Sequence, residues 1–106
     1  MGDFEQLVLL ALLRLDGEGY GMQVRRELEE RLGRTVSVGA VYTTLDRLER
    51  KGLVASRLGE PTPERGGRAR KHFRLLPGAR RALAQSRLVL DRMWEGLPAP
   101  GGGSGR

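Results

Sequence analysis

Residues 37–58 read SVGAVYTTLDRLERKGLVASRL and decide the fold, because a helical period changes to an alternating one within them. Ser37 is a favourable N-cap residue, and apolar residues follow it at helical spacing. The sequence therefore predicts a helix that starts after Ser37 and ends at Gly52, followed directly by a strand over residues 53–58.

This helix has an apolar face and a polar face. At about 100° per residue, the predicted core face consists of Val38, Val41, Leu45 and Leu48. The opposite side carries Gly39, Thr43, Arg47 and Arg50, with Ala40 and Asp46 at its margins and Tyr42 on its flank. Small residues at the N-terminal end would let a DNA groove come close, and Thr43 and Arg47 suit base edges or phosphates. The predicted DNA-reading residues are Ser37, Gly39, Ala40, Tyr42, Thr43 and Arg47. The alternative is an amphipathic helix whose polar face meets only water.

Two further helices are expected before Ser37. Asp3 and Gln6 resemble a capping box that opens a helix running to about Leu15. A second helix covers about residues 20–32, and Gly33 is its expected C-terminal cap. With the short link to Ser37, the second and third helices form a helix-turn-helix.

The first helix is apolar on nearly all sides, since Leu9 and Leu13 lie opposite the face that carries Phe4, Leu7 and Val8. Such a helix needs packing partners on two sides. In so short a chain, we expect a second subunit to supply one of them, with Leu9 and Leu13 in a dimer interface.

Residues 71–75 (KHFRL) read as the return strand of a two-stranded antiparallel ribbon. The 18 residues 57–74 carry six basic and two acidic side chains, a net charge of +4, against −2 for residues 1–36. A basic ribbon after a helix-turn-helix is typical of a wing, whose arginines suit phosphate or a narrow minor groove. The predicted wing contacts are Arg65, Arg68, Arg70 and Lys71. A solvated hairpin is the alternative.

A last helix is expected from about Ala79 to Glu95. Its apolar positions form a short heptad seam made of Ala79, Leu83, Ser86, Leu90, Met93 and Leu97. We expect it to pack with the first helix and to mediate dimerisation through Leu83, Leu90 and Met93. The predicted organisation is a winged helix-turn-helix over residues 1–76, a dimerisation helix over 77–97 and a disordered tail over 98–106.

Composition argues against several function classes. The chain has no cysteine, one histidine (His72) and no clustered carboxylates. We therefore expect no metal site and no cofactor, and we do not expect the protein to be an enzyme. Residues 7–13 are too short an apolar run for a membrane span and lack the basic flank of a signal peptide, so we expect a cytoplasmic protein without membrane contact. His72 is expected to be structural or exposed.

Residues 41–54 (VYTTLDRLERKGLV) resemble the signature of the PadR family, in which a tyrosine begins a Leu-x-x-Leu-Glu-x-x-Gly-Leu run. The similarity continues in LLALL at 9–13, GYG at 19–21 and GGRARKHFRL at 66–75, and covers about residues 4–95. The resemblance implies a mainly α, winged helix-turn-helix protein that binds DNA as a dimer and usually represses transcription. It also implies that the C-terminal helix mediates dimerisation.

The resemblance also bears on Trp94, the only tryptophan. In some compact PadR-like proteins an aromatic residue of the last helix lines a ligand pocket between subunits, so Trp94 is a candidate contact for a small-molecule effector. The favoured interpretation places Trp94 in the core, near Phe4 or Leu7.

The predicted function is a sequence-specific DNA-binding regulator, a homodimeric repressor on a palindromic operator. The main alternative is a winged-helix protein-interaction module, but Thr43, Arg47 and Arg50 on the third helix argue against it. RNA binding is a further alternative, which an aromatic content of 5% disfavours.

Overall fold

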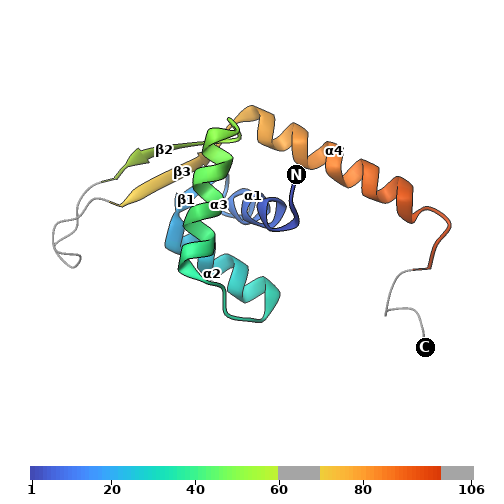
Figure 1. Cartoon of the computed structure of the whole chain (residues 1–106), viewed down its shortest axis with the longest axis horizontal. Helices are drawn as coiled ribbons and strands as arrows, with labels where there is room; N and C mark the ends of the chain where they lie inside the picture. The colour runs from blue at the N-terminus through green and yellow to red at the C-terminus, as the bar shows by residue number, and fades with distance from the viewer. Residues whose placement is uncertain (60–69, 99–106) are drawn as a thin grey trace.

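The computed structural model describes residues 1–59 and 70–98, which form helices on one side of a small sheet (Figure 1). The elements follow in the order α1 (Asp3–Arg14), β1 (Glu18–Tyr20), α2 (Gly21–Leu32), α3 (Val38–Arg50), β2 (Val54–Leu58), β3 (Lys71–Leu75) and α4 (Pro77–Trp94). The predicted mainly α, winged helix-turn-helix fold is confirmed.

The helix ends show which local signals were read correctly. Gly33 caps α2 with a φ of 70°, and the Ser37 hydroxyl caps α3, as predicted. The predicted capping box of Asp3 and Gln6 is wrong, because Gly2 is the N-cap residue of α1. The Gly2 N–H donates to Glu5 Oε1 at 3.4 Å, so it is Glu5 that turns back toward the helix start.

The sheet has three antiparallel strands in the order β1-β3-β2, not the predicted two. The extra strand, β1, lies in a segment expected to be a turn. It pairs along the open edge of β3, with Gly19 opposite Phe73 and Tyr20 opposite His72. The Leu75 N–H donates to the Gly17 carbonyl at 2.8 Å and extends this pairing. Three residues give no alternating pattern, so only the partner strand reveals that β1 is extended.

The core lies between α1, α2, α3 and the inner face of the sheet. Phe73 on β3 is its largest fully buried side chain. The remaining buried hydrophobic residues are Val8, Leu9, Ala11, Leu12, Val24, Leu28, Val36, Val41, Leu45, Leu48, Val54, Ala79 and Leu83. Only the last two belong to α4, which leads away from the other helices (Figure 1). Within residues 1–59 and 70–98, no helix has the length and apolar character of a membrane span.

Candidate nucleic-acid interface

The N-terminal end of α3 is held in place by a clamp on the preceding turn. Arg25 Nε donates to the Val36 carbonyl at 2.7 Å, and the Val36 N–H donates to Glu29 Oε2 at 2.9 Å. Arg25 and Glu29 also pair with each other at 3.4 Å, one turn apart on α2. Both polar groups of Val36 are thus satisfied by α2, and the clamp fixes where α3 begins. We define this set of three residues as the turn clamp.

The first turn of α3 is small and open. Ser37 Oγ accepts a hydrogen bond from the Ala40 N–H at 3.2 Å. Ser37, Gly39 and Ala40 are all exposed, as predicted for residues that let another molecule come close to the helix backbone.

The outer face of α3 differs from the predicted one by about 30°, at 100° per residue. Val38 was expected in the core but is 41% exposed, whereas Thr44 is buried beside Val41, Leu45 and Leu48. The centre of the outer face is therefore occupied by Gly39, Thr43, Asp46 and Arg50, all exposed. Arg47 moves from the centre of the predicted face to its margin.

Tyr42 lies at the opposite margin and is half-buried. Its ring packs so closely on Gly21, the first residue of α2, that a Cβ at this position would collide with it. The ring centroid also lies 6.4 Å from that of Phe73. Tyr42 thus joins α3 to α2 and β3, a packing role that its predicted place at the DNA did not anticipate.

At the C-terminal end of α3, three charged side chains meet. Lys51 Nζ lies 2.8 and 3.0 Å from the two carboxylate oxygens of Glu5, and Arg47 Nη1 lies 3.9 Å from Glu5 Oε2. The Glu5 side chain is only 7% exposed, whereas those of Arg47 and Lys51 are about half exposed. The hydrogen bond from Lys51 lowers the pKa of Glu5, against the opposing effect of burial. We define these residues as the Glu5 cluster, which sequence reasoning missed.

The base of the wing is closed around Tyr20 on β1. The Gly59 N–H donates to the Arg70 carbonyl at 2.6 Å, and these two residues flank the undescribed part of the wing. The Arg70 guanidinium lies 4.0 Å from the Tyr20 ring centroid. A Cβ at Gly59 would lie 2.8 Å from the Tyr20 hydroxyl oxygen. Tyr20 therefore contacts both ends of the wing, a role that only the strand β1 makes visible.

Of the predicted wing contacts, Arg70 and Lys71 are described, whereas Arg65 and Arg68 lie outside the described residues. Lys71 is exposed and its Nζ lies 3.8 Å from Asp46 Oδ1, so the wing base and the outer face of α3 adjoin. His72 behind them is buried, and its Nε2 lies 3.2 Å from Glu18 Oε1, which agrees with the expected structural role. Residues 1–59 and 70–98 contain no cluster of metal-ligating side chains.

The predicted dimerisation residues divide into two sets. Leu9 is fully buried inside the chain's own core, so its assignment to a subunit interface is wrong, and its neighbour Leu10 is 42% exposed instead. Leu83 is also buried, against α1. Leu13 is half-buried, whereas Leu90 and Met93 are 51% and 71% exposed.

Trp94 is 46% exposed and is not a core residue, contrary to the favoured interpretation. It lines an open groove of about 620 Å³ between α1 and α4, together with Leu10, Leu13 and Leu90. Leu83 is the last buried residue of α4, and Trp94 follows it by 11 positions at the exposed end of the helix.

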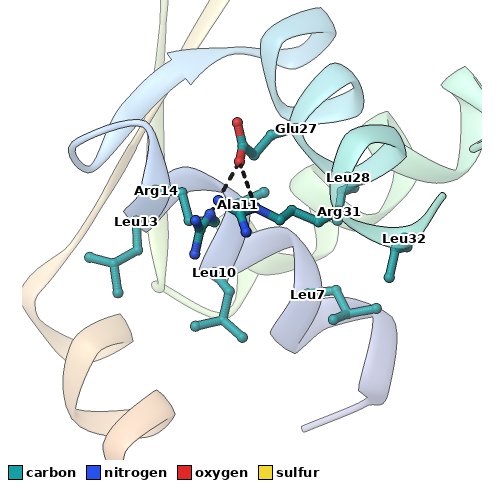
Figure 2. A pocket seen from close by; sticks show the side chains of 9 residues that line it. All are labelled: Leu7, Leu10, Ala11, Leu13, Arg14, Glu27, Leu28, Arg31 and Leu32. Atoms are coloured by element: carbon teal, nitrogen blue, oxygen red, sulfur yellow. Dashed lines mark hydrogen bonds and ion pairs between the residues drawn. The ribbon is translucent and has the colours of Figure 1, made fainter.

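A second apolar groove, of about 410 Å³, runs between α1 and α2 and shares Leu10 and Leu13 with the first. Figure 2 shows Glu27 on its wall between the guanidinium groups of Arg14 and Arg31, at 3.2 and 3.6 Å. The same view shows the leucines of α1 along the groove. α1 thus carries an exposed apolar stripe that two grooves border.

Comparisons with known proteins agree with this architecture. The model of the PadR-like transcriptional regulator family matches residues 9–85. The transcriptional regulator Rv3488 of Mycobacterium tuberculosis is 38% identical over 78 residues, which make up 74% of this chain and 68% of that protein. A PadR family transcriptional regulator from Eggerthella lenta DSM 2243 is similar with a TM-score of 0.70 and 26% identity, over 87% of this chain and 78% of the other. A winged-helix DNA-binding protein from STIV has the same TM-score at 14% identity, over 91% and 96% of the two chains, a likeness of fold alone.

Proposed function

This chain belongs to the PadR-like family of transcriptional regulators, and we propose that it acts by binding double-stranded DNA as a homodimer through α3 and the wing. The sequence resemblance of residues 41–54 is thereby confirmed at the level of the family. Its members are regulators, and we propose no catalytic role and no cofactor for this chain. We also propose that the protein is cytoplasmic, because a regulator of transcription acts where the DNA is.

The observation that carries the proposal is the outer face at the N-terminal half of α3. Gly39, Ala40 and Thr43 are exposed together, and the turn clamp fixes the end of the helix that carries them. A helix end with small side chains and free N–H groups fits the major groove. Thr43, at the centre of this face, is suited to a base edge or a thymine methyl group.

Reading by Thr43 can be tested with a library of randomised operators. Thr43→Ala should weaken the preference at one base pair by about 1–3 kcal/mol while leaving binding to other positions intact. Thr35→Ala, at an exposed position before α3, is the matched control. Unchanged base preferences in a folded Thr43→Ala variant would exclude Thr43 as a reader.

The wing is proposed to supply affinity that does not depend on sequence. Lys71 borders the outer face of α3 through its contact with Asp46, and Arg70 precedes it at the base of the wing. We extend the same role to Arg65 and Arg68, which lie outside the described residues. Each phosphate contact releases counterions, so Arg68→Ala should flatten the plot of log K against log salt by about 0.9. If Arg65, Arg68 and Arg70 all leave the slope unchanged when replaced, the wing does not bind phosphate.

A dimer is proposed through α1 and the second half of α4. Leu10 lines both grooves and Leu90 lines the one between α1 and α4, and both side chains are exposed, as is Met93 on the same half of α4. Exposed apolar surface of this kind is typical of an interaction site. Two α3 helices related by symmetry would read half-sites about 34 Å apart, so we propose a palindromic operator. Repression follows from the usual behaviour of the family.

Sedimentation tests the dimer directly. Wild type should sediment as a dimer at micromolar concentration, and Leu90→Glu should be monomeric, because a carboxylate would have to be desolvated in the interface. Leu58→Glu, at a position 68% exposed on β2, is the control and should remain dimeric. A Leu90→Glu variant that stays dimeric would place the interface elsewhere.

The α1–α4 groove is the proposed site of a small apolar effector. Trp94 lines it and is half exposed, so a bound aromatic molecule would change its fluorescence. Release of operator DNA by the same molecule, lost in Trp94→Ala, would establish a ligand-controlled regulator.

A further inference from the structure

Glu5 is a buried acid that meets cations from the far end of α3. It sits in the first turn of α1, 46 residues from Lys51 in sequence, yet its side chain is 7% exposed and meets two cations of the α3 region. A buried carboxylate is costly unless it is paired, so the pairing with Lys51 and Arg47 is what makes this position tolerable.

The two cations that Glu5 holds belong to the helix proposed to enter DNA. Arg47 lies one turn before Lys51, and both are about half exposed, so both are within reach of solvent and of a nearby phosphate. Their contact with Glu5 points them toward α1, however, and away from the centre of the outer face, where Gly39 and Thr43 lie. A cation that is paired with a carboxylate neutralises less phosphate charge, so fewer counterions are released from the DNA when the protein binds.

Glu5 itself cannot follow its partners outward. Its carboxylate also accepts from the Gly2 N–H at 3.4 Å, at the N-terminus of α1, where the helix dipole favours a negative charge. Arg47 and Lys51 have long flexible side chains that are about half exposed, whereas the Glu5 side chain is 7% exposed. Any contact of these cations with phosphate must therefore compete with a fixed negative charge.

We propose that Glu5 limits the affinity of this chain for DNA of any sequence by holding Arg47 and Lys51, and thereby leaves sequence reading to the N-terminal half of α3. This role rests on the DNA binding proposed above. Glu5 is a positioning residue that raises the ratio of specific to non-specific binding, because it weakens the contacts that carry no sequence information.

The test is the salt dependence of binding to operator and to random-sequence DNA. Glu5→Gln keeps the shape of the side chain and removes its charge. Its slope of log K against log salt should be steeper than that of wild type by about 0.9 for one released cation and about 1.8 for two. The ratio of operator to random-sequence affinity should fall at the same time.

Asp3→Asn is the matched control. Asp3 lies in the same first turn and is exposed, and it has no ion pair within the part of the chain that the structure describes. Both variants change the net charge by the same amount, so only a specific release of Arg47 and Lys51 separates them. Equal slopes for Glu5→Gln and Asp3→Asn would overturn the inference while leaving the proposed function intact, whereas failure of wild type to bind any DNA would remove the proposed function itself.

A double-mutant comparison identifies the cation and covers the case of a Glu5→Gln protein that does not fold. Lys51→Met should flatten the slope more in the Glu5→Gln background than in wild type. In wild type alone, Lys51→Met should flatten it by clearly less than the value of about 0.9 for a full phosphate contact. A full loss of about 0.9 in wild type would overturn the inference, because Lys51 would then bind phosphate despite Glu5.

Discussion

α3 and α4 are both amphipathic helices, but only α3 buries most of its apolar face within this chain. α3 buries four side chains between Val41 and Leu48 and contacts α1, α2 and the sheet. α4 is longer, with 18 residues against 13, yet only Ala79 and Leu83 in its first two turns are buried. Its second half exposes a continuous apolar set, which consists of Leu88, Val89, Leu90, Met93 and Trp94.

The difference separates what one chain determines from what two chains would determine. The orientation of α3 is set by contacts within this chain, so its outer face is already defined in a single subunit. The second half of α4 buries no side chain within this chain, so its apolar residues would be buried only by a partner.

The largest effect is expected in the part of α3 that is fully buried. Leu45→Ala should lower the free energy of unfolding by about 2–5 kcal/mol, because it removes methyl groups from a packed core and leaves a cavity. In the monomer, where the Leu90 side chain is 51% exposed, Leu90→Ala should change the free energy of unfolding by less than about 0.5 kcal/mol. Urea unfolding at a concentration where the protein is monomeric measures both. A cost at Leu90 that equals the cost at Leu45 would show that α4 is packed within one chain.

Local signals in the sequence were sufficient for most of the fold. The Ser37 cap, the Gly33 cap and the five-residue strand 71–75 were all predicted correctly, because each signal lies within a few residues of the feature it produces. The strand that follows the third helix and the last helix were also predicted from local periodicity. The strand β1 could not be found in this way, since three residues become a strand only through their pairing with β3.

The site was harder to predict than the fold, for two physical reasons. First, Thr44 is buried where Val38 was expected, which rotates the buried face by about 30° at 100° per residue. A threonine gives no hydrophobic signal, so the sequence pattern did not indicate this burial. Second, the Glu5 cluster joins residues 46 positions apart, and periodicity carries no information on such contacts. As a result the exposure of Thr43 was predicted, whereas the pairing of Arg47 was not.

The next effect concerns the turn that places α3. Glu29→Ala should lower the free energy of unfolding by about 1–3 kcal/mol, because it leaves the Val36 N–H without its acceptor and removes the ion pair of Arg25. Glu29→Gln should recover much of this loss, since its amide oxygen still accepts from Val36. Glu30→Ala, at an exposed position on the same helix, is the control. Thermal unfolding measures all three, and equal melting temperatures for Glu29→Ala and Glu30→Ala would show that the turn clamp does not hold the turn.

A pH-dependent effect is expected at Glu5. Its pKa in the folded chain is lowered from the ordinary value of a glutamate, mainly by the hydrogen bond from Lys51. A lowered folded pKa means that the charged form stabilises the fold above the unfolded pKa and that this stabilisation is lost as the pH falls through the folded pKa. The difference in free energy of unfolding between wild type and Glu5→Gln should therefore be constant from pH 7 to about pH 5 and shift against wild type in more acidic buffer. A difference that does not change with pH would show that folding does not lower the pKa of Glu5, and hence that its contact with Lys51 does not stabilise the fold.

The smallest effect on stability, and the finest test of the contrast, involves one exposed acid on each helix. Asp46 on α3 lies 3.8 Å from Lys71, and Asp91 on α4 lies 3.8 Å from Arg87. All four side chains are well exposed, so Asp46→Asn and Asp91→Asn should each change the free energy of unfolding by less than about 1 kcal/mol.

Their effects on DNA binding should nevertheless differ. Asp46 lies at the centre of the outer face of α3, where it would repel phosphates and occupy Lys71, so Asp46→Asn should tighten binding to any DNA at low salt. The gain should shrink as salt rises, because exposed charges are screened beyond about 8 Å at physiological ionic strength. Asp91→Asn should leave the affinity of the dimer unchanged, with sedimentation confirming that the dimer persists. Equal gains for the two variants would mean that binding responds only to net charge, and the outer face of α3 would then not be the surface that meets DNA.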